Sequence, residues 1–348
     1  MPVKKRDPFV DHLKAVGIIS IVLGHCCWKL PMTGFPLGPF VYTYHLMVFF
    51  FVSGFCFKKE KAERPWEAMG VRLRNYVPLF VGYGTVYVLL HNVFRSLHMI
   101  SSEKEVYDLS KIIYYTASSF VMTTAETLLS ALWFVPVLFL ANAIFFLIFN
   151  YSEKKSHPVR VRGLLILLTG CIGLYINNAN IGLNYHMQTV FLAVPALYAG
   201  YAAKLSRERL EKYVTWYGTI LAAVLLYGVL SLDIGMIELA KNSIIHPLLF
   251  YPVTAVGIYF CAGLAKAMGH SRLFTCIGKN SFHIMALHFT AIKLVDILYG
   301  AWIHADTAVI ETFPYAFGIW PVYCAAGVFL PLLAVGGARW FLRAVHRG

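Results

Sequence analysis

The feature that most constrains this chain is a succession of apolar stretches, each close to the roughly 20 residues that an α-helix needs to cross a bilayer. Short polar connections separate them along the 348 residues. A bilayer core offers the backbone no hydrogen-bond partner, so such stretches favour helices. Only 14% of the residues are charged and 59% are hydrophobic, which excludes an ordinary soluble domain. The sequence predicts an all-α, polytopic transmembrane bundle forming a single domain over residues 1–348.

The charge of the connections alternates along the chain. We expect about ten spans, near residues 13–30, 39–57, 76–98, 128–150, 163–178, 187–203, 214–232, 247–267, 281–300 and 315–338. Most of the 30 lysines and arginines share one set of connections with both termini, whereas the other set holds only Lys29, Arg95, Lys104, Lys111 and Lys241. Basic residues mark the cytoplasmic side, so both termini are predicted to be cytoplasmic. This distribution accounts for the net charge of +13 without a nucleic-acid partner.

Targeting and metal signals are weak. The first apolar stretch follows Lys4, Lys5 and Arg6, contains Lys14 and lacks a small-residue cleavage site, so no cleavable leader is expected. The seven cysteines fall within or at the edges of apolar stretches without paired metal-ligand spacing. We expect them to be small buried hydrophobic residues and expect no metal site.

The first span carries two ionisable side chains, Lys14 and His25. They lie almost three helical turns apart, so they share one face and differ in depth by roughly 16 Å. Ionisable groups inside a span are costly and are therefore candidates for function. Structural alternatives remain open, because Lys14 can extend to the headgroups and His25 can bond to a neighbouring helix.

Two arginines precede the third span in Arg72-Leu73-Arg74-Asn75-Tyr76-Val77-Pro78. Pro78 suits a first helical turn and disfavours helix at the residue before it. We therefore expect extended chain at Arg72 and Arg74, whose side chains would point the same way and form a fork suited to phosphate. The alternative is a positive-inside anchor.

Further ionisable residues lie in other spans. His45 opens the second span at a depth similar to that of His25, so the two could share a site. His288 lies nearer the inner side of the ninth span. Lys293 and Asp296, three residues apart on that helix, are expected to neutralise each other.

In this order, these residues resemble the acyltransferase-3 family of integral membrane acyltransferases. The strongest portion is residues 11–57, with Asp11-x-x-Lys14, Leu23-Gly24-His25 and the run Tyr44-His45-Leu46-Met47-Val48-Phe49-Phe50-Phe51-Val52-Ser53-Gly54. Weaker matches are Arg72-x-Arg74 with Tyr76-x-Pro78, Leu132-Trp133-Phe134, the stretch 191–201, and Gly278-Lys279-Asn280-Ser281 followed by His288.

The resemblance implies a bundle that takes an acyl group from cytoplasmic acyl-CoA and delivers it to a hydroxyl of a glycan at or beyond the membrane. In that family the first-span histidine and the arginine pair are functional, and they match His25, Arg72 and Arg74. Many members have arginine where this chain has Lys14, so a phosphate contact there would involve a point charge rather than a fork.

These expectations combine into one mechanism. Lys14, Arg72 and Arg74 would hold the phosphates of CoA, and His25 would act as the general base for the acceptor hydroxyl. A covalent acyl-histidine is the alternative. Weaker candidates for orienting His25 or binding the acceptor are His45, Glu126, Trp133 and His288, and Tyr42 and Tyr44 are candidates, with Trp133, for stacking on sugars or for interfacial anchoring.

The predicted activity is an acyl-CoA-dependent O-acyltransferase, most often an O-acetyltransferase in similar proteins. Its acceptor would be a surface or secreted polysaccharide or the lipid-linked precursor, in a bacterial cytoplasmic membrane. A glycan transporter would need interrupted helices at matching positions of two inverted halves, which the sequence does not indicate. An assembly subunit would leave Lys14 and His25 unexplained.

Overall fold

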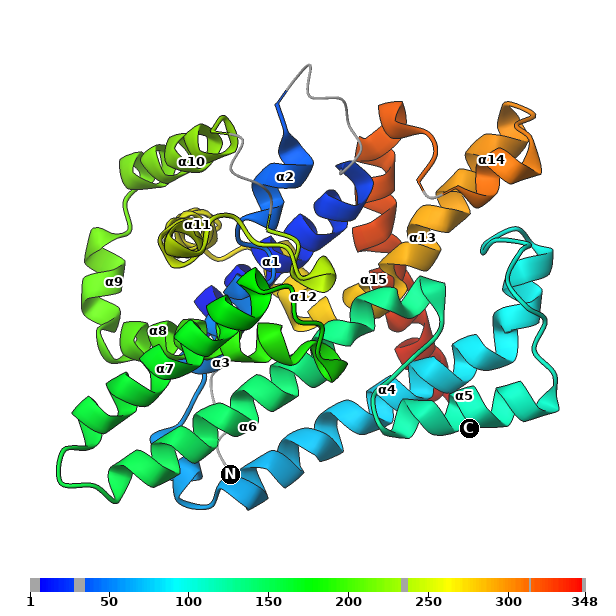
Figure 1. Cartoon of the computed structure of the whole chain (residues 1–348). Coiled ribbons are helices and arrows are strands. Elements are labelled where there is room, and N and C mark those ends of the chain that lie inside the picture. The colour runs from blue at the N-terminus through cyan, green and yellow to red at the C-terminus, as the bar shows by residue number, and fades with distance from the viewer. Residues whose placement is uncertain (1–6, 28–34, 233–236, 313, 346–348) are drawn as a thin grey trace. The chain divides into compact units, whose positions relative to one another are not determined.

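A computed structural model describes residues 7–27, 35–232, 237–312 and 314–345. Every regular element in these ranges is a helix, apart from one isolated bridge between Glu238 and Ser243 (Figure 1). This confirms the prediction of an all-α fold for the described residues. The end of the predicted first span with Lys29, and Lys4, Lys5 and Arg6, lie outside them.

Eight helical segments in the described ranges are long and apolar enough to cross a membrane. They are α1 (Pro8–Cys27), α2 with α3 (Leu37–Tyr42 and Met47–Phe55), α4 (Pro65–Ser96), η2 with α6 (Thr127–Trp133 and Phe134–Glu153), α7 (Pro158–Asn178), α11 (Pro247–Ala267), α13 (Ser281–Trp302) and α15 (Trp320–Val345). A ninth candidate is the bent pair Asn184–Leu205 and Arg207–Tyr213, which contains η3 (Asn184–His186), α8 (Met187–Leu205) and α9 (Arg207–Tyr213) and turns by 92°.

The seventh predicted span, residues 214–232, corresponds to α10 (Trp216–Leu230). This helix has 15 residues, so at 1.5 Å per residue it is roughly 22 Å long, shorter than the ~30 Å hydrocarbon core. The helix α10 is therefore distinguished from the other candidate spans by its shorter length.

Shorter elements lie in the connections: η1 (Lys59–Glu63), α5 (Leu109–Phe120), η4 (Leu239–Lys241), α12 (Arg272–Lys279), α14 (Thr307–Glu311) and η5 (Phe317–Ile319). The Asp108 side chain caps α5 by accepting from the Lys111 backbone N–H at 2.8 Å. Ile113 and Tyr114 on α5 are exposed, whereas Ser119 of the same helix packs against Gly84 of α4.

The chain forms two compact units, each assembled from three chain segments. The first contains residues up to 17, 39–76 and 134–278, and the second contains 18–38, 77–133 and 279 onward. Each unit is therefore built from segments far apart in sequence. The single domain predicted over residues 1–348 stays a prediction.

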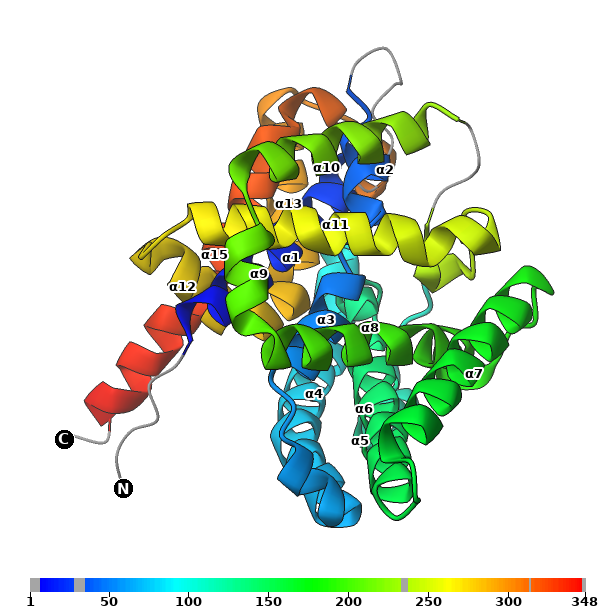
Figure 2. The same cartoon turned by 90° about the vertical axis from the view of Figure 1, so that its left-hand side faces the viewer.

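In the first unit, α8 crosses α3 at the distance of backbone contact (Figure 2). A Cβ atom added to Gly54 would lie 1.8 Å from the carbonyl oxygen of Leu197, and one added to Gly200 would lie 1.9 Å from that of Phe51. Glycine is required at both positions because any side chain would overlap the facing backbone.

In the second unit, a buried polar cluster joins α13 to α15 and to α14. The Lys293 ammonium lies 3.4 Å from the Asp296 carboxylate, and both side chains are almost fully buried. Tyr323 donates a hydrogen bond to Asp296, and Lys293 donates to the carbonyl of Ile310. The predicted pairing of Lys293 with Asp296 is confirmed, and it is part of a larger network.

The cysteines divide by exposure. Cys26, Cys27 and Cys261 are buried as predicted, but Cys56, Cys171 and Cys276 are exposed and Cys324 is half-buried. The prediction of burial is therefore wrong for Cys56, Cys171 and Cys276. Cys171 is exposed because most of α7 is exposed.

Candidate active site

His25 lies in the second unit, against two aromatic side chains of α13. Its ring centroid is 5.3 Å from that of His288 and 4.6 Å from that of Phe289. His25 is half-buried, whereas His288 is fully buried. The structure thus brings together two of the predicted site residues, His25 and His288.

The hydrogen bonds of His288 define its tautomer. Its Nδ1 donates to the backbone carbonyls of Met285 and Ile284, at 2.9 and 3.1 Å. The proton of the neutral ring is therefore on Nδ1, and Nε2 is an acceptor. Nε2 is buried and has no hydrogen-bond partner among the described residues. An acceptor atom without a donor thus lies on a ring beside His25.

Lys14 lies in the first unit and is half-buried. Its positive charge acts on the thiol of Cys56, as do the charges of Lys204 and Arg72. Cys56 is exposed by area, yet surrounding atoms desolvate its thiol and raise its pKa, and the three cations oppose that rise. The structure therefore places Lys14 and Arg72 close enough to influence one group.

The predicted fork of Arg72 and Arg74 is wrong. The helix α4 begins at Pro65 and runs through Pro78, so the arginines are helical and not extended. Residues two apart on a helix point to different sides. Arg72 is half-buried with its guanidinium 5.5 Å from the centre of the Phe146 ring, whereas Arg74 is exposed.

His45 lies in the turn between α2 and α3, in the first unit. It is buried, its Nδ1 donates to the Val41 carbonyl at 3.1 Å, and its ring centroid is 4.6 Å from that of Tyr42. Tyr42 and Tyr44 are also buried. Burial of both tyrosine rings leaves little surface for stacking on a sugar.

Glu126 has a partner that sequence reasoning missed, His91 of α4. The two buried side chains meet at 3.0 Å between Nδ1 and Oε2, and His91 stacks on Tyr107 with 3.5 Å between ring centroids. His91 Nε2 also lies 3.1 Å from the backbone carbonyl of Glu105. The signal for His91 was available, because it is an ionisable residue within the predicted span 76–98.

One sequence candidate, Trp133, and one residue that was not a candidate, His12, remain to be placed. Trp133 is half-buried at the end of η2. His12, which the sequence did not single out, is buried in the first unit, with Nε2 3.1 Å from the Thr275 hydroxyl and Nδ1 3.3 Å from the Ala265 carbonyl. These contacts hold α1 against α11 and α12.

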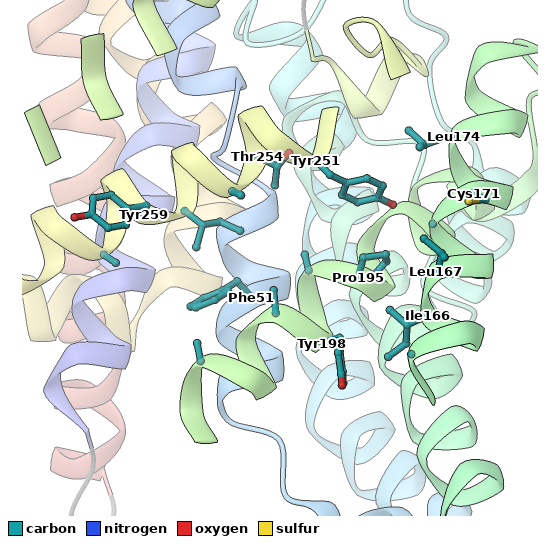
Figure 3. Close-up of a pocket in the computed structure, with 18 of the residues that line it drawn as sticks. Phe51, Ile166, Leu167, Cys171, Leu174, Pro195, Tyr198, Tyr251, Thr254 and Tyr259 are labelled. Atoms are coloured by element: carbon teal, nitrogen blue, oxygen red, sulfur yellow. The ribbon is translucent and has the colours of Figure 1, made fainter. Parts of the chain in front are cut away.

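An apolar cavity of about 580 Å³ lies between α3, α7, α8 and α11 in the first unit (Figure 3). Pro195 and Tyr198 of α8 line it with Leu167 of α7 and Thr254 of α11. Its lining contains no charged side chain and none of the predicted site residues. The cavity therefore offers nothing that would bind the phosphates of a donor. Among the residues described, no group of three or more His, Cys, Asp or Glu is placed to hold a metal ion.

The comparison with known families agrees with the resemblance seen in the motifs. A family profile described as an acyltransferase domain matches residues 7–336, nearly the whole chain. The chain belongs to the acyltransferase-3 family. Neither a curated protein nor a solved structure matches it. As a member of the acyltransferase-3 family, it is a multi-pass integral membrane transferase.

The structure explains why glycine occupies two of the acyltransferase-3 motif positions of this chain. Gly54 ends the motif run of the second span and is needed for the crossing with α8. A Cβ atom at Gly278 would lie 1.8 Å from the carbonyl oxygen of Asp11, so α12 and α1 also pack at backbone distance. Membership of the acyltransferase-3 family does not by itself assign a chemical role to these glycines.

Proposed function

We propose that the protein is an O-acyltransferase that moves an acyl group, most simply acetyl, from acyl-CoA to a hydroxyl of a glycan. The acceptor is a cell-surface or secreted glycan or its lipid-linked precursor. Membership of the acyltransferase-3 family supports the transfer chemistry. The observation that carries the assignment of the site is the half-buried His25 beside the buried acceptor nitrogen of His288.

His25 is the general base in this proposal. The acceptor oxygen attacks the thioester carbonyl carbon while its proton passes to His25. The carbon–sulfur bond then breaks, and the departing thiolate takes the proton from His25. An ester and free CoA thiol result, and the imidazole returns to its neutral form. Imidazole suits both steps because its unperturbed pKa of about 6.5 lies near cellular pH.

Lys14 and Arg72 are the donor-binding cations, with Arg74 as a weaker contributor because it is exposed. Both Lys14 and His25 belong to α1, so one continuous helix carries a donor-binding residue and the base. Ammonium and guanidinium groups bind phosphate through charge-assisted hydrogen bonds.

The remaining candidates have orienting or acceptor-binding roles. His288 positions His25 through Nε2. Glu126, held by His91, and the half-buried Trp133 are proposed for the acceptor. His45 has the least support, because its Nδ1 is engaged with the backbone and its ring is buried.

The proposed location is a bacterial cytoplasmic membrane, with both termini and the donor in the cytoplasm. The distribution of lysine and arginine supports this orientation. A transporter with inverted halves would need matched interrupted helices, whereas the described part of the chain has a single bent pair.

The test is glycan O-acetylation, measured by mass spectrometry in cells that lack this gene. They are complemented with the wild type, His25→Ala or His157→Ala at matched membrane levels. His157 is an exposed residue that precedes α7 and serves as the control. We expect the wild type and His157→Ala to restore the ester and His25→Ala to restore none.

A second measurement separates transfer from transport. Purified protein with acetyl-CoA and a glycan acceptor should release free CoA thiol, whereas a transporter would leave the thioester intact. Full activity of His25→Ala in either assay would exclude His25 as the base. An acetyl group retained on the protein after incubation with donor alone would instead support the acyl-histidine route.

A further inference from the structure

Three cationic side chains act on the segment that follows α3. Only two of them, Lys14 and Arg72, were predicted from the sequence as candidate donor-binding residues. Lys14, Arg72 and Lys204 all act electrostatically on Cys56. Lys204, in the last turn of α8, was predicted only as a basic residue of a cytoplasmic connection. All three side chains are half-buried.

Hydrogen bonding fixes Lys204 at this place. Its ammonium donates to the carbonyl oxygen of Phe57 at 2.7 Å. An ammonium group has three N–H donors, so two remain after this contact. Because Phe57 immediately follows Cys56, the contact also fixes Lys204 beside the thiol.

Ring packing brings Arg72 to the same segment. The Arg72 guanidinium lies over the ring of Phe146, and that ring is 5.1 Å from the ring of Phe57, centroid to centroid. Arg72 is thus linked to Phe57 through the ring of Phe146, whereas Lys204 contacts the Phe57 carbonyl directly. Arg74 is exposed and is not among the charges that act on Cys56.

With the residues that the structure describes, Lys14, Arg72 and Lys204 form no ion pair of their own, and Asp7, the acid that also acts on Cys56, is paired with Arg207. Within the described ranges, no carboxylate oxygen lies within 4.0 Å of Lys14, Arg72 or Lys204. Half-buried like charges repel each other and lose hydration, so such a group is stabilised by binding an anion.

A neighbouring basic cluster in the first unit behaves differently. Arg207 is paired with Asp7 and with Glu211, the latter at 2.8 Å, and Lys266 donates to the carbonyls of Glu211 and Val214 at 2.6 and 2.8 Å. Those charges are already engaged by the protein, so this cluster is a poor anion site.

We propose that Lys204 is a donor-binding residue, and that with Lys14 and Arg72 it holds the diphosphate of acyl-CoA beside Cys56. This inference rests on the proposed function, since it assigns a residue to the same donor. It replaces the predicted partner of Arg72, because Lys204 and not Arg74 shares its surroundings.

Cys56 can report on donor binding because the residue is exposed and the charges of the three cations act on its thiol. Purified full-length protein is treated with a thiol-alkylating reagent at increasing CoA concentration, and modification of Cys56 is followed by peptide mass spectrometry. Cys171, exposed on α7, is the internal reference. Pantetheine, which lacks the diphosphate, is the control ligand.

We expect CoA to slow alkylation of Cys56 but not of Cys171, and pantetheine to slow neither. Lys204→Gln keeps a donor for the Phe57 carbonyl but removes the charge, and it should raise the CoA concentration for half-protection by at least about tenfold. Lys204→Arg should stay near the wild-type value. Lys212→Gln, an exposed change on α9, should have no effect.

Two results would overturn the inference. The first is an equal CoA concentration for half-protection in Lys204→Gln and the wild type, with a higher one in Lys14→Gln and Arg72→Gln. This result would exclude Lys204 as a donor-binding residue while leaving the proposed function intact. If CoA does not slow alkylation of Cys56 in the wild type, the proposed diphosphate site as a whole is excluded. The effect of His25→Ala on ester formation is measured separately, so either result is distinguishable from a failure of the proposed reaction.

Discussion

At the scale of single residues, the chemistry of His25 depends on which of its ring nitrogens holds the proton. A neutral imidazole can accept a proton at one nitrogen only if the other is already protonated. His288 Nε2 is an acceptor with no hydrogen-bond partner among the described residues, and in the proposed arrangement it would favour a proton on a His25 nitrogen turned towards it. The other nitrogen of His25 is then available to the acceptor hydroxyl.

His288→Phe tests this arrangement, because phenylalanine keeps an aromatic ring but has no acceptor nitrogen. We expect kcat to fall roughly 100-fold, within the range of general-base effects, with little change in KM for the donor. His288→Gln, which returns an acceptor atom, should recover part of the rate. Equal losses in both variants with an unchanged pH profile would indicate a packing role instead.

Arg72 and Arg74 should differ although both belong to the family motif. Arg72→Ala should raise KM for acyl-CoA by about tenfold or more, because a half-buried guanidinium and its contact with Phe146 are lost. Arg74→Ala should change KM less than about threefold, as for an exposed charge. Steady-state kinetics on both variants decide this, and equal effects would contradict the structural distinction.

At the scale of elements, the crossing of α3 and α8 makes a sharp prediction. Gly54→Ala should destabilise the protein by about 3 kcal/mol or more, because its methyl group would overlap the Leu197 carbonyl. Gly82→Ala, inside α4 with no neighbouring atom within 4 Å, is the matched control and should change stability by less than about 1 kcal/mol. Thermal unfolding in detergent measures both, and similar Tm values would argue against the close crossing.

The second unit contains a pH-sensitive contact between two connections. His98 and Ser102 bond to Glu311 at 2.8 to 3.0 Å and lower the pKa of its carboxyl group from 4.5 to about 2. A lowered carboxyl pKa stabilises the fold above the unfolded value and loses that effect as pH falls through the folded value. The contribution is therefore complete above pH 4.5 and declines towards pH 2.

Glu311→Gln should accordingly lower Tm at pH 6 to 7, and the difference from the wild type should shrink as pH falls below about 4.5. Glu103→Gln, a change of an exposed carboxylate in the same connection, is the control. Unfolding scans from pH 7 to about 2 measure the trend. A difference that grows with acidity would contradict the assigned direction.

The elements show where sequence reasoning succeeds and where it stops. Apolar stretches predicted most spans, because hydrophobic length is a local property. The predicted extended conformation at Arg72 was wrong because Pro78 was taken to mark the start of a helix, whereas α4 continues through Pro78. Proline is tolerated inside membrane helices when the surroundings satisfy the released carbonyl. Contacts such as His91 with Glu126 join residues 35 positions apart and cannot be read from local pattern.

At the scale of the whole molecule, the number of crossings must be even if both termini lie on one side. The eight candidate helices of the described ranges give an even number, and the bent pair alone would make it odd. The positive-inside prediction for the connection containing Arg209 therefore requires that α8 and the short α10 both cross. Ten crossings would then result.

Arg209→Cys, in a chain from which the exposed cysteines have been removed, tests this count. We expect a membrane-impermeant thiol reagent to modify it only from the cytoplasmic face. Cysteine introduced at Lys154 is the control for that face, and cysteine at Lys104 is the control for the opposite face. Modification of position 209 from the outer face would mean eight crossings, with α8 and α10 both failing to span.

The pairing of His25 with His288 also has a consequence for biosynthesis. The two histidines come from opposite ends of the chain, and the segments of each unit are interleaved in sequence. The ribosome adds roughly 5–20 residues per second, so His288 is synthesised up to tens of seconds after His25. Until then the nascent protein can hold α1 in the membrane without its partner ring. On the proposal that His288 positions His25, a prematurely terminated chain without α13 would therefore be inactive.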